Sequence, residues 1–122
     1  MSGAAFDAPV LLDALEGHPA AGAELLRYHQ RYISRLTWLA VMCRAQPDDA
    51  QRAERFLSHF GVIELSEEIA ASAAQLCGLR PGLSPENAVV LASAQVTGRI
   101  LITRNTKDFP VAMPGIRVPY TL

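Results

Sequence analysis

The chain has 122 residues, 50% of them hydrophobic, and a formal net charge of −1 at pH 7. This length fits one domain with a single core, and no apolar run approaches membrane-spanning length. The near-neutral charge excludes a global field that would draw the protein to nucleic acid or a membrane surface, so any RNA contact needs a local patch. The first residues lack the pattern of a secretory signal, and we therefore expect a cytoplasmic protein.

Short apolar strands alternate with helices along the chain. Helix starts carry N-caps and first-turn prolines, as at Pro9, Ser34 and Ser84. In chain order the predicted elements are a strand at 4–7, helices at about 9–17 and 20–29, a strand at 32–33, helices at about 34–44 and 50–60, a strand at 62–65, helices at about 66–77 and 84–95, and strands at 100–102 and 116–118. This alternation predicts an α/β fold with a parallel sheet in three layers.

The stretch GRILITRNTKDFP, from Gly98 to Pro110, changes abruptly from a buried strand to a polar turn. In open parallel sheets, ligand groups collect beyond the carboxyl ends of the strands. Thr103, Asn105 and Asp108 therefore lie where a site is expected, and Asp7 ends the first strand in the same way. The alternative interpretation is an ordinary polar loop with a capping aspartate.

Four stretches carry a family resemblance and follow one another in the family's order. They are FDAPVLLDAL at Phe6–Leu15, ISRLTWLAVM at Ile33–Met42, ENAVVLASAQVTG at Glu86–Gly98 and ILITRNTKDF at Ile100–Phe109. With the closing GIRVPY they span nearly the whole chain, and it resembles a PIN domain of the short VapC type, the toxins of bacterial toxin–antitoxin pairs. The resemblance implies one PIN-like domain over residues 1–122, a three-layer α/β/α fold and a central, mostly parallel sheet of four to five short strands. It also implies an antitoxin protein as partner, RNA as substrate and a homodimer.

Proteins similar to this one are Mg²⁺- or Mn²⁺-dependent endoribonucleases, in which clustered carboxylates hold a metal ion that activates water against a phosphodiester. The four acid positions of the family fall on Asp7, Ala40, Asn87 and Asp108. Two carboxylates of the four are present, and Asn87 offers a neutral oxygen instead. We expect Mg²⁺ or Mn²⁺ to be weakly bound or absent, since fewer anionic ligands hold the ion less firmly.

The resemblance also implies roles for individual residues. Catalytic roles fall on Asp7, Asn87 and Asp108, metal ligation on Asp7, Asn105 and Asp108, and substrate binding on Thr103, Arg104 and Lys107. Arg104 and Lys107 flank Asp108, so they could contact phosphate or equally neutralise the local acids.

Three further acids are candidates to replace the missing carboxylates. Glu86 precedes Asn87 by one residue, a rotation of roughly 100° on a helix, so we expect it to point elsewhere. Asp13 is expected at the surface or behind the ligands rather than on the metal. Glu64 is expected at a strand end in a solvated position.

Two functional hypotheses from different classes follow. The first is a VapC-like ribonuclease toxin with weakened or lost catalysis, because Ala40 and Asn87 stand at acid positions. The second is a catalytically inactive PIN-type module that binds a partner protein, because Ala8 and Pro9 also replace polar residues of the family in the same cavity. A phosphoacceptor receiver domain is a third possibility. Such a domain requires a clustered acid pair on the first strand and a lysine at the end of the last strand, and this chain matches neither feature convincingly.

Overall fold

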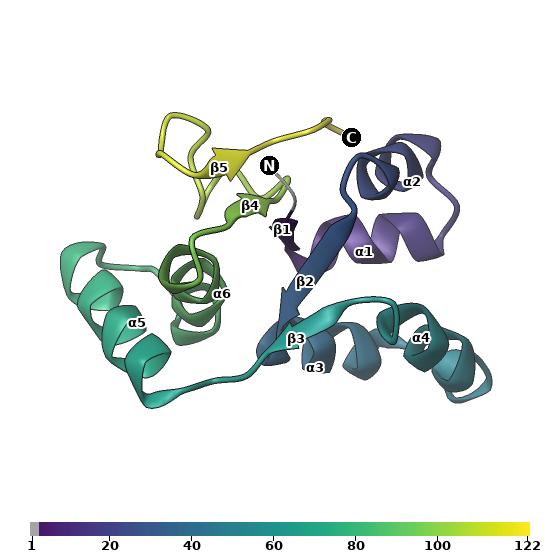
Figure 1. Ribbon diagram of the computed structural model, residues 1–122, viewed down its shortest axis with the longest axis horizontal. Coiled ribbons are helices and arrows are strands. Elements are labelled where there is room, and N and C mark those ends of the chain that lie inside the picture. The colour runs from purple at the N-terminus through teal and green to yellow at the C-terminus, as the bar shows by residue number, and fades with distance from the viewer. Residues whose placement is uncertain (1–2) are drawn as a thin grey trace.

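The computed structural model describes residues 3–122, which form a five-stranded sheet between two groups of helices (Figure 1). The strands are β1 (Gly3–Phe6), β2 (Gln30–Ser34), β3 (Gly61–Ile63), β4 (Ile100–Ile102) and β5 (Ile116–Arg117). Their order in the sheet is β3-β2-β1-β4-β5, and every neighbouring pair is parallel. The predicted three-layer α/β fold with a parallel sheet is confirmed.

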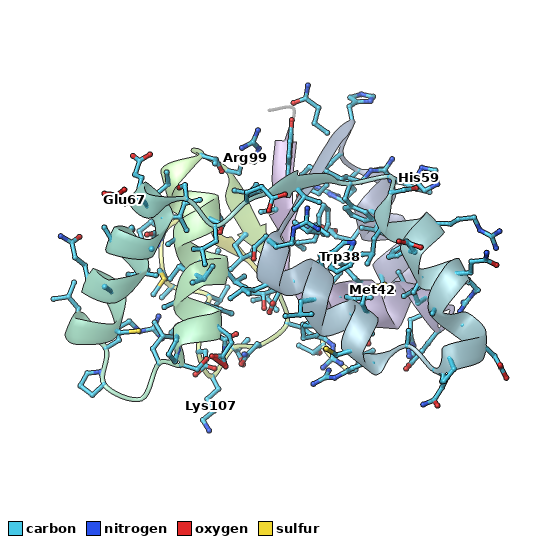
Figure 2. The ribbon with its side chains drawn as sticks, turned by 90° about the horizontal axis from the view of Figure 1, so that it is seen from below. Trp38, Met42, His59, Glu67, Arg99 and Lys107 are labelled. Atoms are coloured by element: carbon cyan, nitrogen blue, oxygen red, sulfur yellow. The ribbon has the colours of Figure 1, made fainter. Side chains whose placement is uncertain are left out.

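Helices cover both faces of this sheet. They are α1 (Ala8–Leu15), α2 (Pro19–Leu26), α3 (Arg35–Arg44), the 3-10 turn η1 (Pro47–Asp49), α4 (Ala50–Leu57), α5 (Glu67–Leu79) and α6 (Pro85–Val96). Helices α1 to α4 lie on one side, and α5 and α6 pack together on the other (Figures 1 and 2). Among the described residues, no helix combines the length and the apolar character needed to cross a bilayer.

Helix starts follow the capping residues of the sequence. The side chains of Ser34, Ser66 and Ser84 each accept a hydrogen bond from a backbone N–H in the first turn of α3, α5 and α6. These bonds satisfy donors that have no partner inside the helix, and such caps typically contribute about 1 kcal/mol each. Asp7, predicted as the last residue of the first strand, is instead the N-cap of α1.

The central strand β1 distributes its side chains to two cores. Ala4 and Phe6 pack in the cluster formed with α1 to α4, whereas Ala5 packs with Leu101 and with residues of α6. This follows from the two-residue period of a strand, which sends neighbouring side chains to opposite faces. Phe6 is fully buried, and its ring meets that of Phe60 edge to face at a centroid distance of 6.0 Å.

Element boundaries differ from the predictions where strands pair. Helix α2 ends at Leu26 rather than near His29, because Gln30 already pairs with Gly3 in the sheet. Strand β3 covers Gly61–Ile63 rather than 62–65, because its register with β2 runs from Gly61 opposite Tyr32 to Ile63 opposite Ser34. Sheet pairing therefore overrides the local pattern at both places.

The sheet reverses its order of strands between β1 and β4. The chain adds β2 and β3 on one side of β1, and it later adds β4 and β5 on the other. Such a switch point opens a crevice outside the carboxyl ends of the two strands, which is where ligands bind in open α/β sheets. Asp7 follows β1, and the loop from Thr103 to Asp108 follows β4, so both meet at this point.

Candidate active site

Asp7 is buried at the switch point and held on both carboxylate oxygens. It is 4% exposed, its Oδ1 accepts the Ala8 N–H at 2.9 Å, and its Oδ2 accepts the Thr103 hydroxyl at 2.8 Å. Burial raises the pKa of Asp7, although the bonds from Thr103 and Ala8 lower it, and the negative charge of Asp108 raises it further. The two acids predicted as metal ligands are therefore close enough to interact.

Thr103 connects the two halves of the site. Its side chain is fully buried, and its hydroxyl group accepts the backbone N–H of Asn105 at 3.0 Å while it donates to Asp7. The contact with substrate that we predicted for Thr103 stays a prediction. In the structure its hydroxyl group contacts Asp7 on one side and the start of the loop on the other.

Asp108 is held by two amide side chains. Nδ2 of Asn87 donates to its Oδ2 at 2.7 Å, and Nδ2 of Asn105 donates to the same oxygen at 3.3 Å. The backbone N–H of Asp108 in turn donates to Oδ1 of Asn105 at 3.3 Å. Position 87 therefore presents an amide donor to Asp108.

A hollow of about 410 Å³ opens beside these groups, over α3 and the start of α6. Asp7, Ala40, Asn87 and Asn105 line it, so three of the four acid positions share one cavity. Asp108 is not among the lining residues, but it accepts hydrogen bonds from Asn87 and Asn105, which are. The methyl group of Ala40 leaves this wall of the cavity without charge.

The position of Glu86 differs from the prediction. It was expected to point away from the site, but it is exposed and lines the same hollow as Asn87. The first turn of α6 lies at the rim of the cavity, so adjacent residues both reach the opening there. Glu86 therefore belongs to the lining of the hollow, next to Asn87.

A second hollow, of about 730 Å³, continues from the first and shares Pro9, Arg44 and Asn105 with it. Arg104 and Lys107 also line it, together with the acids Asp13 and Glu16, so this part of the crevice carries charges of both signs. Arg44 was not predicted. Its place at i+4 from Ala40, on the same helical face, is the sequence signal that points to it.

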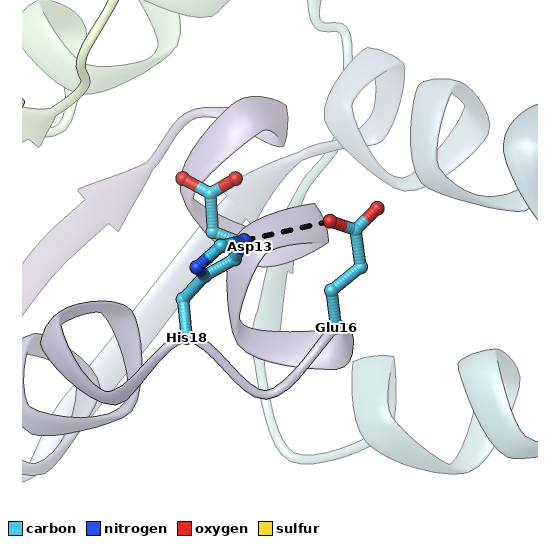
Figure 3. A group of neighbouring side chains, drawn as sticks. All are labelled: Asp13, Glu16 and His18. Atoms are coloured by element: carbon cyan, nitrogen blue, oxygen red, sulfur yellow. Dashed lines mark ion pairs between the residues drawn. The ribbon is translucent and has the colours of Figure 1, made fainter. Parts of the chain in front are cut away.

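Asp13, Glu16 and His18 lie together at the end of α1 and the turn that follows (Figure 3). Each could offer one ligand atom, and these atoms are within 4.8 Å of one another. Arg104 donates to both oxygens of Asp13, however, and Nε2 of His18 already contacts Glu16 at 3.6 Å. These three residues form a group separate from the Asp7 site, and Arg104 neutralises the charge of Asp13.

Asp13 was expected either at the surface or behind the ligands. It is buried at 4% exposure, which agrees with the second of these alternatives. Glu64 is exposed as predicted, but it forms a two-pronged ion pair with Arg35 at 2.9 and 2.5 Å and does not approach the site. Tyr120, which bonds Asp13, was missed because nothing in its local sequence relates it to a residue so far away.

Comparisons with known proteins agree with this architecture. The PIN domain model matches residues 4–112. A toxin–antitoxin complex from Klebsiella pneumoniae contains a chain with 37% identity and a TM-score of 0.90, over 98% of this chain and 99% of that chain. No curated protein matches the sequence.

Two more distant structures share the fold alone. VapBC2 from Rickettsia felis, bound to a DNA fragment from their promoter, contains a chain with 16% identity and a TM-score of 0.77, over 93% of this chain and 95% of that one. DNA-bound VapBC from Salmonella typhimurium gives 21% identity and a TM-score of 0.75, over 96% of each chain.

Proposed function

The chain belongs to the PIN domain family, and from that premise we propose that it is the toxin-type member of a toxin–antitoxin pair, with weakened divalent-metal-dependent endoribonuclease activity. One observation carries the proposal. The Asp7 and Asp108 carboxylates remain at the switch point, but Asn87 places an amide donor 2.7 Å from Asp108 and Ala40 lines the cavity without charge. In this proposal residues 1–122 act as one cytoplasmic domain.

The remaining donors fit a hard divalent cation held weakly. Mg²⁺ is commonly bound through one or two carboxylates while it keeps several water ligands. Asp7 and Asp108 would supply the carboxylates and Asn105 an amide oxygen, with Asn87 facing the same space. When bound, the ion would activate water for attack on a phosphodiester.

The chain's own groups prepare this site. Thr103 orients the Asp7 carboxylate, and Asn87 and Asn105 orient that of Asp108. Burial of Asp7 raises its pKa and so opposes the charged form that a metal needs. A cation therefore competes with a proton at Asp7 and with amide donors at Asp108, and both effects lower its affinity.

RNA is the substrate in this proposal, and the crevice beside the site supplies the cations. Lys107 is exposed and extends away from the protein (Figure 2), and Arg44 lines both hollows. These positively charged groups could bind the phosphates on either side of the bond that is cut. Arg104, the other predicted phosphate contact, lines the larger hollow.

The proposed partner is an antitoxin protein. The relative with 37% identity was solved as a toxin–antitoxin complex, and the more distant VapBC structures are DNA-bound pairs. We also propose a homodimer, for which light scattering should give about twice the chain mass of 13.2 kDa. A mass of one chain at all concentrations would reject the dimer but leave the antitoxin proposal standing.

The test of the proposed activity combines calorimetry and RNA cleavage. Wild-type protein should bind Mn²⁺ weakly and cleave RNA in millimolar Mn²⁺, and Asp7→Asn should abolish both. Asp48→Asn is the matched control, because Asp48 is an exposed acid on η1 outside the lining of both site hollows. Cleavage that survives Asp7→Asn would contradict the proposal.

The second candidate function is a catalytically inactive PIN-type module that binds a partner protein. The observation in its favour is that Ala8, Pro9, Ala40 and Asn87 all line the one cavity, so the departures from the family pattern are concentrated at the metal position. This candidate predicts no heat of Mn²⁺ binding and no cleavage in the wild type. Measurable Mn²⁺-dependent cleavage that requires Asp7 would exclude it.

A further inference from the structure

A buried carboxylate on α1 joins two segments from the far end of the chain. Asp13 is 4% exposed and accepts hydrogen bonds from Nε and Nη2 of Arg104 at 2.7 and 3.2 Å. The hydroxyl group of Tyr120 donates to the same carboxylate at 2.7 Å. Burial opposes ionisation, but the bonds from Arg104 and Tyr120 hold the pKa of Asp13 below its usual value. Asp13 and Arg104 therefore form an ion pair at neutral pH.

Arg104 lies inside the loop that carries the site. It follows Thr103, whose hydroxyl group donates to Asp7, and it precedes Asn105, whose amide group donates to Asp108. Residues 104–115 contain no helix or strand, so no regular backbone ladder fixes this part of the loop. One turn inside it is closed by the bond from the Phe109 N–H to the Asn105 carbonyl at 3.0 Å, and side-chain contacts at each end join the loop to the rest of the fold.

The far end of the loop has its own anchors. Phe109 is fully buried in the core beside α6, and Arg80 donates to the backbone carbonyl of Asp108. The near end has no comparable apolar anchor after Thr103. There the Thr103 hydroxyl group accepts the Asn105 N–H, and the ion pair between Arg104 and Asp13 ties the loop to α1.

We infer that Asp13 is a positioning residue of the site, which acts through Arg104, together with Tyr120, to fix the loop that presents Asn105 and Asp108. The inference rests on the proposed function only where it assigns Asn105 and Asp108 to a metal site. Asp13 does not serve as a metal ligand in this role, because its oxygens are occupied by donors from Arg104 and Tyr120.

The same geometry assigns Arg104 to the loop rather than to substrate. Nε and Nη2 form one of the two edges with which a guanidinium group makes two-pronged contacts to phosphate, and both donate to Asp13. Lysine keeps the charge of arginine but lacks this planar fork. The role of Arg104 can therefore be separated from that of a phosphate contact by Arg104→Lys.

The chain contains a matched control for Asp13. Glu24 on α2 is also 4% exposed, and it accepts from Nε and Nη2 of Arg117 at 2.7 and 3.1 Å and from the hydroxyl group of Tyr28 at 3.3 Å. It is a buried acid with arginine and tyrosine partners, but its side-chain bonds reach β5, whose backbone accepts the Thr103 N–H, and not Arg104. Glu24→Gln therefore measures the general effect of breaking such a group.

Amide hydrogen exchange of the metal-free protein, followed residue by residue by NMR, is the first readout. Asp13→Asn should speed exchange at Asn105 and Asp108 by about 10-fold or more, with little change at Leu101 in β4, because only the loop is released. Glu24→Gln should leave Asn105 and Asp108 within about 2-fold of the wild type. A purely structural role of Asp13 would instead speed exchange in the core and the loop alike.

Mn²⁺ affinity is the second readout. Asp13→Asn should weaken it by about 10-fold, the usual effect of removing a group that orients a ligand, while Glu24→Gln should leave it unchanged. If the wild type binds no Mn²⁺, the proposed function fails, and the exchange measurement alone decides the inference.

Two milder variants keep the test decisive if Asp13→Asn does not fold. Tyr120→Phe removes one donor and keeps the ring, and Arg104→Lys removes the fork and keeps the charge. Both should speed exchange selectively at Asn105 and Asp108, and Arg104→Lys should do so more strongly. Unchanged exchange at these two amides in both variants, or equal effects of Asp13→Asn and Glu24→Gln, overturns the inference.

Discussion

Restoring the two missing carboxylates tests whether lost charge limits metal binding. We predict that Ala40→Glu combined with Asn87→Asp raises Mn²⁺ affinity by at least about 100-fold. In the wild type, the methyl group of Ala40 lines the cavity and the amide of Asn87 donates to Asp108 at 2.7 Å, so neither supplies a negative ligand. Groups that only orient a ligand alter affinity by about 10–100-fold, so each restored ligand should contribute at least about 10-fold. Together these amount to about 2.8 kcal/mol of binding free energy.

The same double change should destabilise the metal-free protein. The new carboxylate at position 87 replaces a donor that contacts Asp108 at 2.7 Å with a second acceptor of like charge. Two carboxylates that share a site cannot both ionise without cost, so one of their pKa values rises. Bound Mn²⁺ reverses this, because a ligand present at 100 times its Kd stabilises the folded state by about 2.7 kcal/mol. We expect a lower Tm than the wild type in chelator and a higher Tm in Mn²⁺.

Calorimetric titration measures the affinity, and thermal unfolding with and without Mn²⁺ measures the two opposite shifts. The matched control is Ala40→Gln with Asn87 unchanged, which adds a side chain of similar length without charge. It should bind Mn²⁺ no better than the wild type. If the double variant has wild-type affinity, positions 40 and 87 do not face a common ion, and the assignment of the acid positions is refuted.

The remaining predictions concern the supports of the site and the sheet. Burial raises the pKa of Asp7, so the folded state loses stability as pH rises from the unfolded pKa of about 3.9 through the raised folded pKa. Asp7→Asn should therefore be more stable than the wild type at pH 7 in chelator. Urea titrations should show this difference in unfolding free energy shrinking towards pH 4. Thr103→Val removes the hydroxyl donor to Asp7 and should cost about 1–3 kcal/mol of unfolding free energy, with a further rise in the pKa of Asp7 measurable by NMR. Gly61→Ala places a Cβ 2.8 Å from ring carbons of Tyr32 and should cost about 1–3 kcal/mol in urea unfolding, whereas Gly22→Ala, which meets nothing within 4 Å in α2, should stabilise by about 0.5–1 kcal/mol.

Much of the fold could be predicted because its signals are local. Ser34 and Ser84 cap helices as predicted, and the apolar run at Ile100–Ile102 is a buried strand. The errors fall where a tertiary contact competes with a local preference. The sequence pattern predicts a helix as far as His29, but Gln30 pairs with Gly3 and the helix ends earlier. The apolar spacing likewise extends to Phe60, which lies beyond the end of α4 although its ring packs in the core.

The features of the site also divide into those that the sequence predicts and those that depend on tertiary contacts. The meeting of Asp7 with the loop at Asp108 follows from parallel topology, which brings the ends of β1 and β4 to one edge. The rotation rule for Glu86 failed because the first turn of a helix lies at the cavity rim and exposes more than one face. The bond between Asp13 and Tyr120 joins residues 107 positions apart, and no periodic pattern encodes such a contact.

The cost of keeping Asp7 favours the weakened enzyme over the inactive module. A buried carboxylate with a raised pKa destabilises the fold at neutral pH, and a chain that served only partner binding would gain stability from an amide there, as Asn87 already provides beside Asp108. Thr103 and the Arg104–Asp13 pair shape the loop without metal, and the two acids also accept hydrogen bonds there, Asp7 from Thr103 and Asp108 from Asn105. The raised pKa of Asp7 is a cost that the proposed metal chemistry would explain and that the inactive module would not.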